Sequence, residues 1–165
     1  MSRAALYKKS EELKQRYSLY GLFATVFYLV AVLVGGAVYA STNLPVYLSL
    51  NAAYASGYGT SVFVQSLLVL LSFILLATGA LLVFLSRATT ARGEFTSSTK
   101  LIRSSIVVTA LAIVFSASAL FPPASHIINE FFYLYLVLII IALGLAAYST
   151  LLLKAVVNYY TPRRK

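Results

Sequence analysis

The stretch PPASHIINE at residues 122–130 holds the only histidine of the chain and one of its four acidic residues. His126 and Glu130 are four residues apart, so they share one helix face if helical structure begins near Ser125. Such a pair could respond to pH, supply half of a metal site, or contact a quinone or a partner protein. The simpler interpretation is that Ser125 or the prolines begin a helix, with Glu130 near the positive end of its dipole. We favour this second interpretation, and the first stays open.

The residue types of the chain limit what other chemistry it can perform. It has no cysteine and no aspartate, which excludes disulfides, thiolate metal sites and Ser-His-Asp triads within the chain. A single histidine also excludes a haem held by two imidazoles of this chain. We therefore predict no catalytic, cofactor-binding or metal-binding residues in the chain alone, and no cofactor is identified.

Composition indicates a membrane protein, because 61% of the 165 residues are hydrophobic and 10% are charged. Long uncharged runs recur, each near or above the roughly 18 residues needed to cross a bilayer. Closed barrels would show shorter, alternating segments instead. We predict an all-α bundle of four transmembrane helices, arranged as two helical hairpins. The predicted divisions are a basic helical lead-in at 1–16, a transmembrane domain at 17–158 with spans about 17–40, 61–86, 101–121 and 128–157, and a basic tail at 159–165.

The basic residues give the expected orientation. All 13 lie before the first span, between the end of the second span and the first residues of the third, or at the end of the fourth. The positive-inside rule then places both termini in the cytoplasm of a multi-pass protein of the cell or cytoplasmic membrane. The same residues attract anionic lipid headgroups, and we expect no nucleic-acid binding. The residues are Arg3, Lys8, Lys9, Lys14, Arg16, Arg87, Arg92, Lys100, Arg103, Lys154, Arg163, Arg164 and Lys165.

The segments that flank the spans carry further expectations. The lead-in should form a solvated collar with an ion pair between Glu12 and Arg16. Although Val38-Tyr39-Ala40 resembles a signal-peptide cleavage site, the apolar run is too long, so we expect a retained anchor. The polar and basic composition of the inner segment 87–103 predicts a flexible, solvated loop.

Two outer connections are expected, of very different lengths. Residues 41–60 form a long uncharged outer segment that either seals the bundle or binds a ligand or partner. The short connection at 122–130 predicts a tight hairpin of spans three and four.

The third span carries small residues at spacings of three and four, which place them on one helix face. Another helix can approach such a face closely, and its hydroxyl groups can form bonds across the contact. Whether this face lies inside the bundle or against another subunit stays open. The predicted face is Ser105, Thr109, Ala112, Ser116 and Ala119.

Few polar side chains remain within the spans, and none at mid-membrane depth is ionisable. Possible intramembrane contacts are Gln65, Ser72 and Thr78. At the outer end of span four we predict an interfacial aromatic belt. It comprises Phe131, Phe132, Tyr133 and Tyr135.

Together these features favour a non-catalytic structural or accessory subunit of a larger integral-membrane assembly, with other membrane subunits or further copies of the chain as partners. The first alternative is a small channel or carrier for a neutral or apolar solute. The second is a subunit that contributes to a shared membrane redox or lipid-chemistry site.

Overall fold

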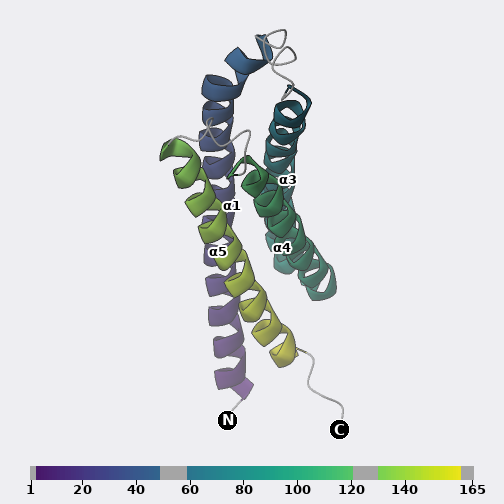
Figure 1. The fold of residues 1–165 in the computed structure, drawn as a ribbon. Coiled ribbons are helices and arrows are strands. Elements are labelled where there is room, and N and C mark those ends of the chain that lie inside the picture. Colours follow the sequence, from purple (N-terminus) through teal and green to yellow (C-terminus); the bar gives the residue numbers. More distant parts are fainter. Residues whose placement is uncertain (1–2, 49–58, 121–129, 161–165) are drawn as a thin grey trace.

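The computed structural model describes residues 3–48, 59–120 and 130–160, and these ranges are entirely helical apart from the connection at 92–94. The long helices are α1 (Arg3–Leu48), α3 (Gly59–Ala91), α4 (Phe95–Ala117) and α5 (Glu130–Tyr160). A 3-10 helix, η1 (Ser118–Leu120), extends α4 (Figure 1). Each long helix contains a segment long and apolar enough to cross a membrane, which confirms the predicted four-helix architecture. These segments are Tyr7–Ala37, Phe63–Ala91, Phe95–Ala117 and Phe131–Asn158.

The outward faces of all four helices are apolar. Leu33 is 72% exposed, Val114 63% and Leu151 61%. Contiguous apolar surface of this kind is rare on a protein in water, because each exposed side chain would cost free energy there. A hydrocarbon environment removes that cost, which agrees with a multi-pass membrane protein.

Helix α1 is longer than the predicted first span, since the expected lead-in and span form one continuous helix. Most described side chains of the lead-in are exposed, but Ser10 is 4% exposed. One side of this segment packs inside the bundle. Its ion pair joins Lys14 Nζ to Glu11 Oε1 at 3.0 Å, in place of the predicted pair between Glu12 and Arg16.

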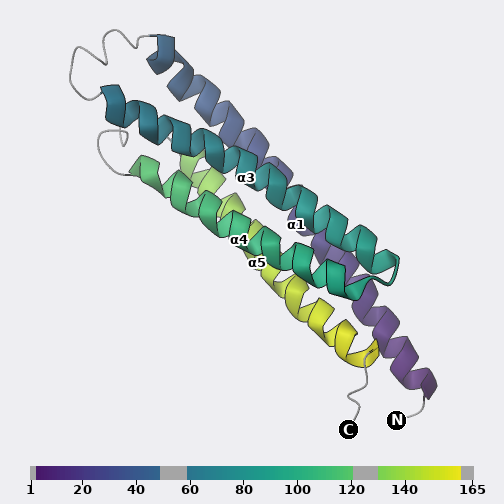
Figure 2. The ribbon, with the colours of Figure 1, turned by 90° about the vertical axis from the view of Figure 1, so that its right-hand side faces the viewer.

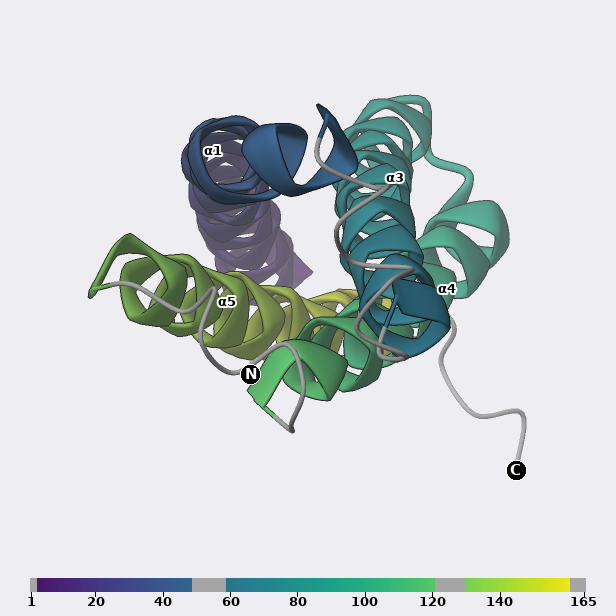
Figure 3. The ribbon, with the colours of Figure 1, turned by 45° about the horizontal axis from the view of Figure 1, so that its top comes forward.

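At its other end α1 continues to Leu48, into the segment predicted to begin the outer loop at residue 41. Pro45 lies within these last turns. A proline inside a helix lacks the N–H donor and its ring clashes with the carbonyl of residue i−4, which bends the helix. The end of α1 leans toward α3 in Figures 1 and 3. The rest of the predicted loop, residues 49–58, lies outside the described ranges.

The connection between α3 and α4 is the largest departure from expectation. In place of a flexible loop over 87–103, α3 runs to Ala91 and α4 begins at Phe95. Gly93 has a φ of 83°, a conformation that favours glycine. Its N–H donates to the Thr90 carbonyl and the Glu94 N–H donates to the Thr89 carbonyl. These two bonds form a Schellman motif, which ends α3 and reverses the chain within three residues.

The four helices form two closely packed pairs. The most extensive contacts join α1 to α5 and α3 to α4, while α4 and α5, although consecutive, touch less. Figure 1 shows α1 beside α5 and α3 beside α4, and Figure 2 shows α3 and α4 side by side along their length. Both termini lie at the same end as the α3–α4 turn (Figure 1). The predicted tight hairpin of α4 and α5 is therefore the weaker contact, and its connection at 121–129 is outside the described residues.

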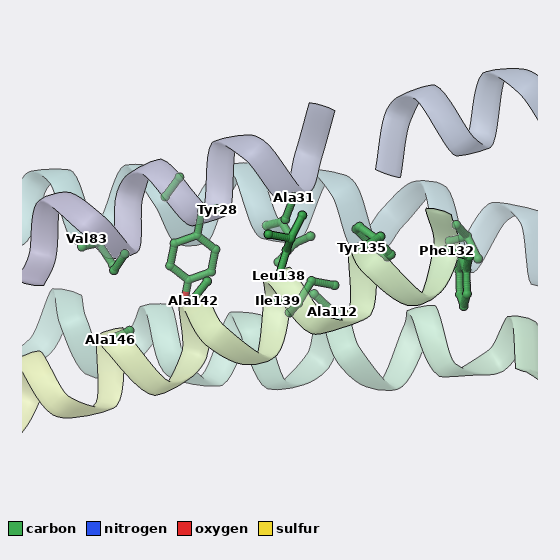
Figure 4. Packing of buried hydrophobic residues seen from close by; sticks show 14 residues of the cluster. Tyr28, Ala31, Val83, Ala112, Phe132, Tyr135, Leu138, Ile139, Ala142 and Ala146 are labelled. Carbon is green, nitrogen blue, oxygen red and sulfur yellow. The ribbon is translucent and has the colours of Figure 1, made fainter. Parts of the chain in front are cut away.

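Small and branched apolar side chains fill the space between the pairs (Figure 4). Alanines on α1, α3, α4 and α5 let the backbones approach closely. The fully buried members of this core include Ala24, Ala31, Leu76, Val83, Ala112, Ile139, Ala142 and Ala146.

Candidate functional site: a row of buried tyrosines

Three tyrosines are the largest fully buried side chains among the described residues. Tyr17 and Tyr28 lie on α1 and Tyr135 lies on α5, each at most 1% exposed. A tyrosine hydroxyl removed from water needs a hydrogen-bond partner. Each of the three finds one on a helix of the opposite pair, and we call Tyr17, Tyr28 and Tyr135 the tyrosine row.

Tyr17 bonds at the end of the bundle that holds both termini. Its hydroxyl oxygen is 2.6 Å from Ser86 Oγ on α3, and Ser86 Oγ in turn donates to the Ser98 carbonyl on α4 at 2.7 Å. Because Ser86 has one hydroxyl hydrogen, Tyr17 is the donor in the first bond. The hydroxyl oxygens of Thr89 and Thr90 lie 2.7 and 2.8 Å from Ser98 Oγ. The segment that looked like a loop is thus held by hydroxyl contacts between α3 and α4.

Tyr28 bonds near the middle of the bundle. Its hydroxyl oxygen is 2.7 Å from Thr109 Oγ1 on α4, which donates to the Ser105 carbonyl of its own helix at 2.7 Å. Tyr28 is therefore the donor to Thr109. On α3, Gly79 lies close to both groups, since a Cβ there would be 3.2 Å from Thr109 Oγ1 and 3.5 Å from the Tyr28 ring.

Tyr135 bonds toward the opposite end of the bundle. Its hydroxyl oxygen is 2.8 Å from Ser72 Oγ on α3 and 2.9 Å from Ser116 Oγ on α4. Ser72 Oγ and Ser116 Oγ also lie 2.6 and 2.8 Å from the Val69 and Ala112 carbonyls of their own helices. Because each hydroxyl has one hydrogen, Tyr135 donates to one serine, and it accepts from the other only when that serine releases its own carbonyl. The ring meets Phe73 edge-on, with 5.5 Å between centroids. Gly35 on α1 makes room for both rings, because a Cβ there would be 2.6 Å from each.

All the bonds of the tyrosine row connect the α1/α5 pair to the α3/α4 pair. The tyrosines come from one pair, and the serines and threonine come from the other. Hydroxyl contacts also occur within the α3/α4 pair, and apolar side chains fill the space between the two pairs. The tyrosine row therefore adds directional polar contacts to the apolar packing that joins the pairs. Figure 4 shows Tyr28 and Tyr135 among the buried side chains of the core.

The small-residue face predicted on span three takes part in this arrangement. Ser105, Thr109, Ala112 and Ser116 are all fully buried, and they lie on the side of α4 that accepts the tyrosines. Ala119 falls in η1, and its side chain is outside the described set. The sequence pattern predicted that another helix packs closely on this face of α4. It did not predict that tyrosine side chains make the contact.

Two of the four residues in the predicted aromatic belt are exposed, and their position at a membrane interface stays a prediction. Phe131 and Tyr133 are 63% and 56% exposed. Phe132 and Tyr135 are 4% and 0% exposed and belong to the core, because they lie on the opposite side of α5. A signal for Tyr28 was present in the sequence, since it interrupts an apolar run well away from either end of the span.

The possible intramembrane contacts have different surroundings. Gln65 is half-buried, and its Nε2 donates to the Ser118 carbonyl at 3.2 Å. Ser72 is fully buried and bonds Tyr135. Thr78 is exposed on α3, and its hydroxyl donates to the Ile74 carbonyl one turn earlier.

The His126–Glu130 pair lies outside what the structure describes. His126 falls in the segment 121–129, and Glu130 is the first residue of α5 but its side chain is not described. Their contact therefore stays a prediction. Within 3–48, 59–120 and 130–160, no three His, Cys, Asp or Glu side chains gather as metal ligands would.

No protein-family model matches the chain, and no curated protein or solved structure is significantly similar to it. Arguments about function therefore depend on the residues and contacts described above.

Proposed function

We propose that this protein is a non-catalytic structural or accessory subunit of a larger integral-membrane assembly. The observation that carries the proposal is that the buried hydroxyl groups of the tyrosine row bond to serine and threonine hydroxyls of the opposite helix pair. Their hydrogen-bonding capacity goes into fixing the shape of the bundle. That shape presents four apolar outward faces, to which other membrane helices could pack.

Tryptophan substitutions at four exposed alanines would test this proposal. Ala37, Ala77, Ala110 and Ala147 lie on α1, α3, α4 and α5. The native chain has no tryptophan, so each variant also carries a single fluorescent reporter.

After extraction in mild detergent, wild type should elute well above the 17.9 kDa of one chain plus its detergent. At least one Ala→Trp variant should elute without the co-purifying protein, because the tryptophan blocks the helix face that contacts it. Variants at faces that make no contact should keep the co-purifying protein and serve as controls. Wild type eluting as a single chain with no co-purifying protein would contradict the proposal.

We further propose that both termini are cytoplasmic. Ten of the 13 basic residues lie in the described ranges, all in the α3–α4 turn or in the parts of the helices near it, which supports this orientation. The chain has no cysteine, so Thr96→Cys at the turn introduces a single label site. An impermeant maleimide should label it in inverted vesicles but not in intact cells. The reverse pattern would show the opposite orientation.

A second candidate function is a small channel or carrier for a neutral solute. The observation in its favour is that hydroxyl contacts recur along the bundle interior, from Tyr17 to Tyr135. Liposomes containing the purified protein should then take up small neutral solutes faster than empty vesicles, and Ser72→Ala should alter the rate. Equal uptake across a solute panel would remove this candidate.

A further inference from the structure

Arg87 is the only charged residue of α3, and it lies inside the helix, four residues before its end. The sequence assigned it to a solvated loop, but its side chain is half-buried against α1. A charged group at the border of an apolar span is costly unless it reaches water, a headgroup or a partner of opposite charge. The surroundings of Arg87 therefore indicate what it binds.

Gly21 on α1 holds the aliphatic part of the Arg87 side chain. A Cβ at Gly21 would lie 2.8 Å from Arg87 Cδ and 3.0 Å from Cγ, so only glycine allows this contact without a shift. Beyond Gly21, Arg87 Nη2 donates to Ser18 Oγ at 3.3 Å. Ser18 is nearer the N-terminus of α1, so the guanidinium extends toward the end of the bundle where the termini lie. This is the direction in which an arginine reaches a membrane surface.

The guanidinium has more donors than the described residues satisfy. It carries five N–H groups, and within the described part of the chain its hydrogen bond is the one to Ser18. Nε is buried and has no partner among those residues. Among the described residues, the ion pair that forms joins Lys14 to Glu11 and does not involve Arg87. No described carboxylate therefore neutralises the Arg87 charge.

The neighbouring side chains favour a lipid as the source of the missing anion. On the span side of Arg87, Leu22 of α1 is 43% exposed and Phe84 of α3 is 54% exposed. On the other side, one turn toward the end of α3, Ala91 is small and exposed, which leaves the guanidinium open. A lipid with an anionic headgroup matches this arrangement. Its headgroup can contact the guanidinium while its acyl chains cover Leu22 and Phe84.

We propose that Arg87 and Ser18 bind the phosphate group of one anionic phospholipid where α1 and α3 meet. Arginine suits phosphate because its planar fork can donate two parallel hydrogen bonds, and the Ser18 hydroxyl adds a third donor. The inference depends on the proposed membrane placement but not on the role as an assembly subunit. It differs from diffuse attraction of lipid by the basic end, because it assigns the binding to two named side chains.

Native mass spectrometry in an uncharged detergent tests the site by titration with phosphatidylglycerol. Wild type should bind one phosphatidylglycerol more tightly than phosphatidylcholine, and Arg87→Met should weaken that first binding about tenfold. The matched control is Arg92→Met, which removes an exposed charge at the adjacent turn and should change the affinity much less. Far-ultraviolet circular dichroism checks that the variants stay helical.

A second pair of variants changes the geometry and keeps the charge. Gly21→Ala should displace the arginine side chain and also weaken the first binding, whereas Gly36→Ala, which has open space around it, should not. Equal losses for Arg87→Met and Arg92→Met, or no loss for Gly21→Ala in a folded protein, would overturn the proposal in favour of diffuse attraction. Release of the bound lipid by millimolar inorganic phosphate would instead identify a site for free anions. If the protein purifies as a single chain without partner proteins and still binds the lipid, the subunit role is refuted and the lipid site is supported.

Discussion

The hydroxyl oxygen of Tyr28 on α1 lies 2.7 Å from Thr109 Oγ1 on α4, 81 residues further along the chain. Gly79 of α3 packs against both groups, so three helices meet at this contact. The bond crosses from one helix pair to the other, as do those of Tyr17 and Tyr135. Stability of the bundle should therefore depend on these few hydroxyl groups as well as on its apolar packing.

Tyr28→Phe should lower the free energy of unfolding by about 0.5–1.5 kcal/mol, the usual contribution of one such hydrogen bond in a membrane protein. Thr109 would keep its bond to the Ser105 carbonyl, so no new donor is left unpaired. Unfolding by sodium dodecyl sulfate in mixed micelles, followed by circular dichroism, measures the change. Tyr133→Phe, at an exposed position, is the control and should be neutral. Equal stability of both variants would show that the Tyr28 bond adds nothing.

Gly35→Ala should be much more harmful than Gly36→Ala. A methyl group at Gly35 would lie 2.6 Å from the rings of Phe73 and Tyr135, whereas Gly36 has nothing within 4 Å. Overfilling a packed interior costs about 1–3 kcal/mol. The same unfolding assay compares these neighbouring substitutions, and a result in which Gly35→Ala is as stable as wild type would contradict the packing at this position.

Ser149→Ala should be neutral or stabilising, although Ser149 is fully buried on α5. Its Oγ has no hydrogen-bond partner among the described residues, and a buried unpaired hydroxyl costs about 1–3 kcal/mol. Ser116→Ala is the contrasting variant, since it removes a partner of Tyr135 and should destabilise. A loss of stability on Ser149→Ala would mean that this hydroxyl is bonded in the folded protein.

Gly93→Ala should destabilise the α3–α4 turn by about 1–2 kcal/mol, because a side chain is disfavoured at positive φ. Gly144→Ala, in the middle of α5 with open space around it, should have no such cost. Thermal unfolding in detergent distinguishes the two. Hydrogen exchange at Glu94 should also become faster in Gly93→Ala, since its N–H closes the turn. Unchanged exchange there would contradict the role assigned to Gly93.

The sequence was sufficient for the four helices because their apolar runs are long and continuous. It was misleading at the α3–α4 connection, where Thr89, Thr90 and Ser98 resemble a polar loop. Their hydroxyl groups bond to one another and to backbone carbonyls, so both helices continue through residues that composition assigns to solvent. The C-terminal end of α3 therefore could not be located from polarity alone.

The small face of α4 could be predicted because it is a local property, a spacing within one helix. Its tyrosine partners could not, because Tyr28 and Tyr135 reach it from helices whose placement depends on the whole fold. The same reason explains Arg87. Arg87 is followed by polar residues in the sequence, which predicts a side chain in solvent. Its actual surroundings include Gly21, 66 residues earlier, and this contact depends on the packing of α1 against α3.

Tyr17 and Tyr28 lie eleven residues apart on α1, which corresponds to about 16 Å along the helix axis. Tyr17 bonds to α3 and Tyr28 bonds to α4. For α1 to slide or turn against the other pair, both bonds would have to break together, and Gly79 would no longer face the Tyr28 ring. The two tyrosines thus fix the position of α1 along its own axis relative to α3 and α4. A displacement of the N-terminal end of α1 would therefore move the whole helix.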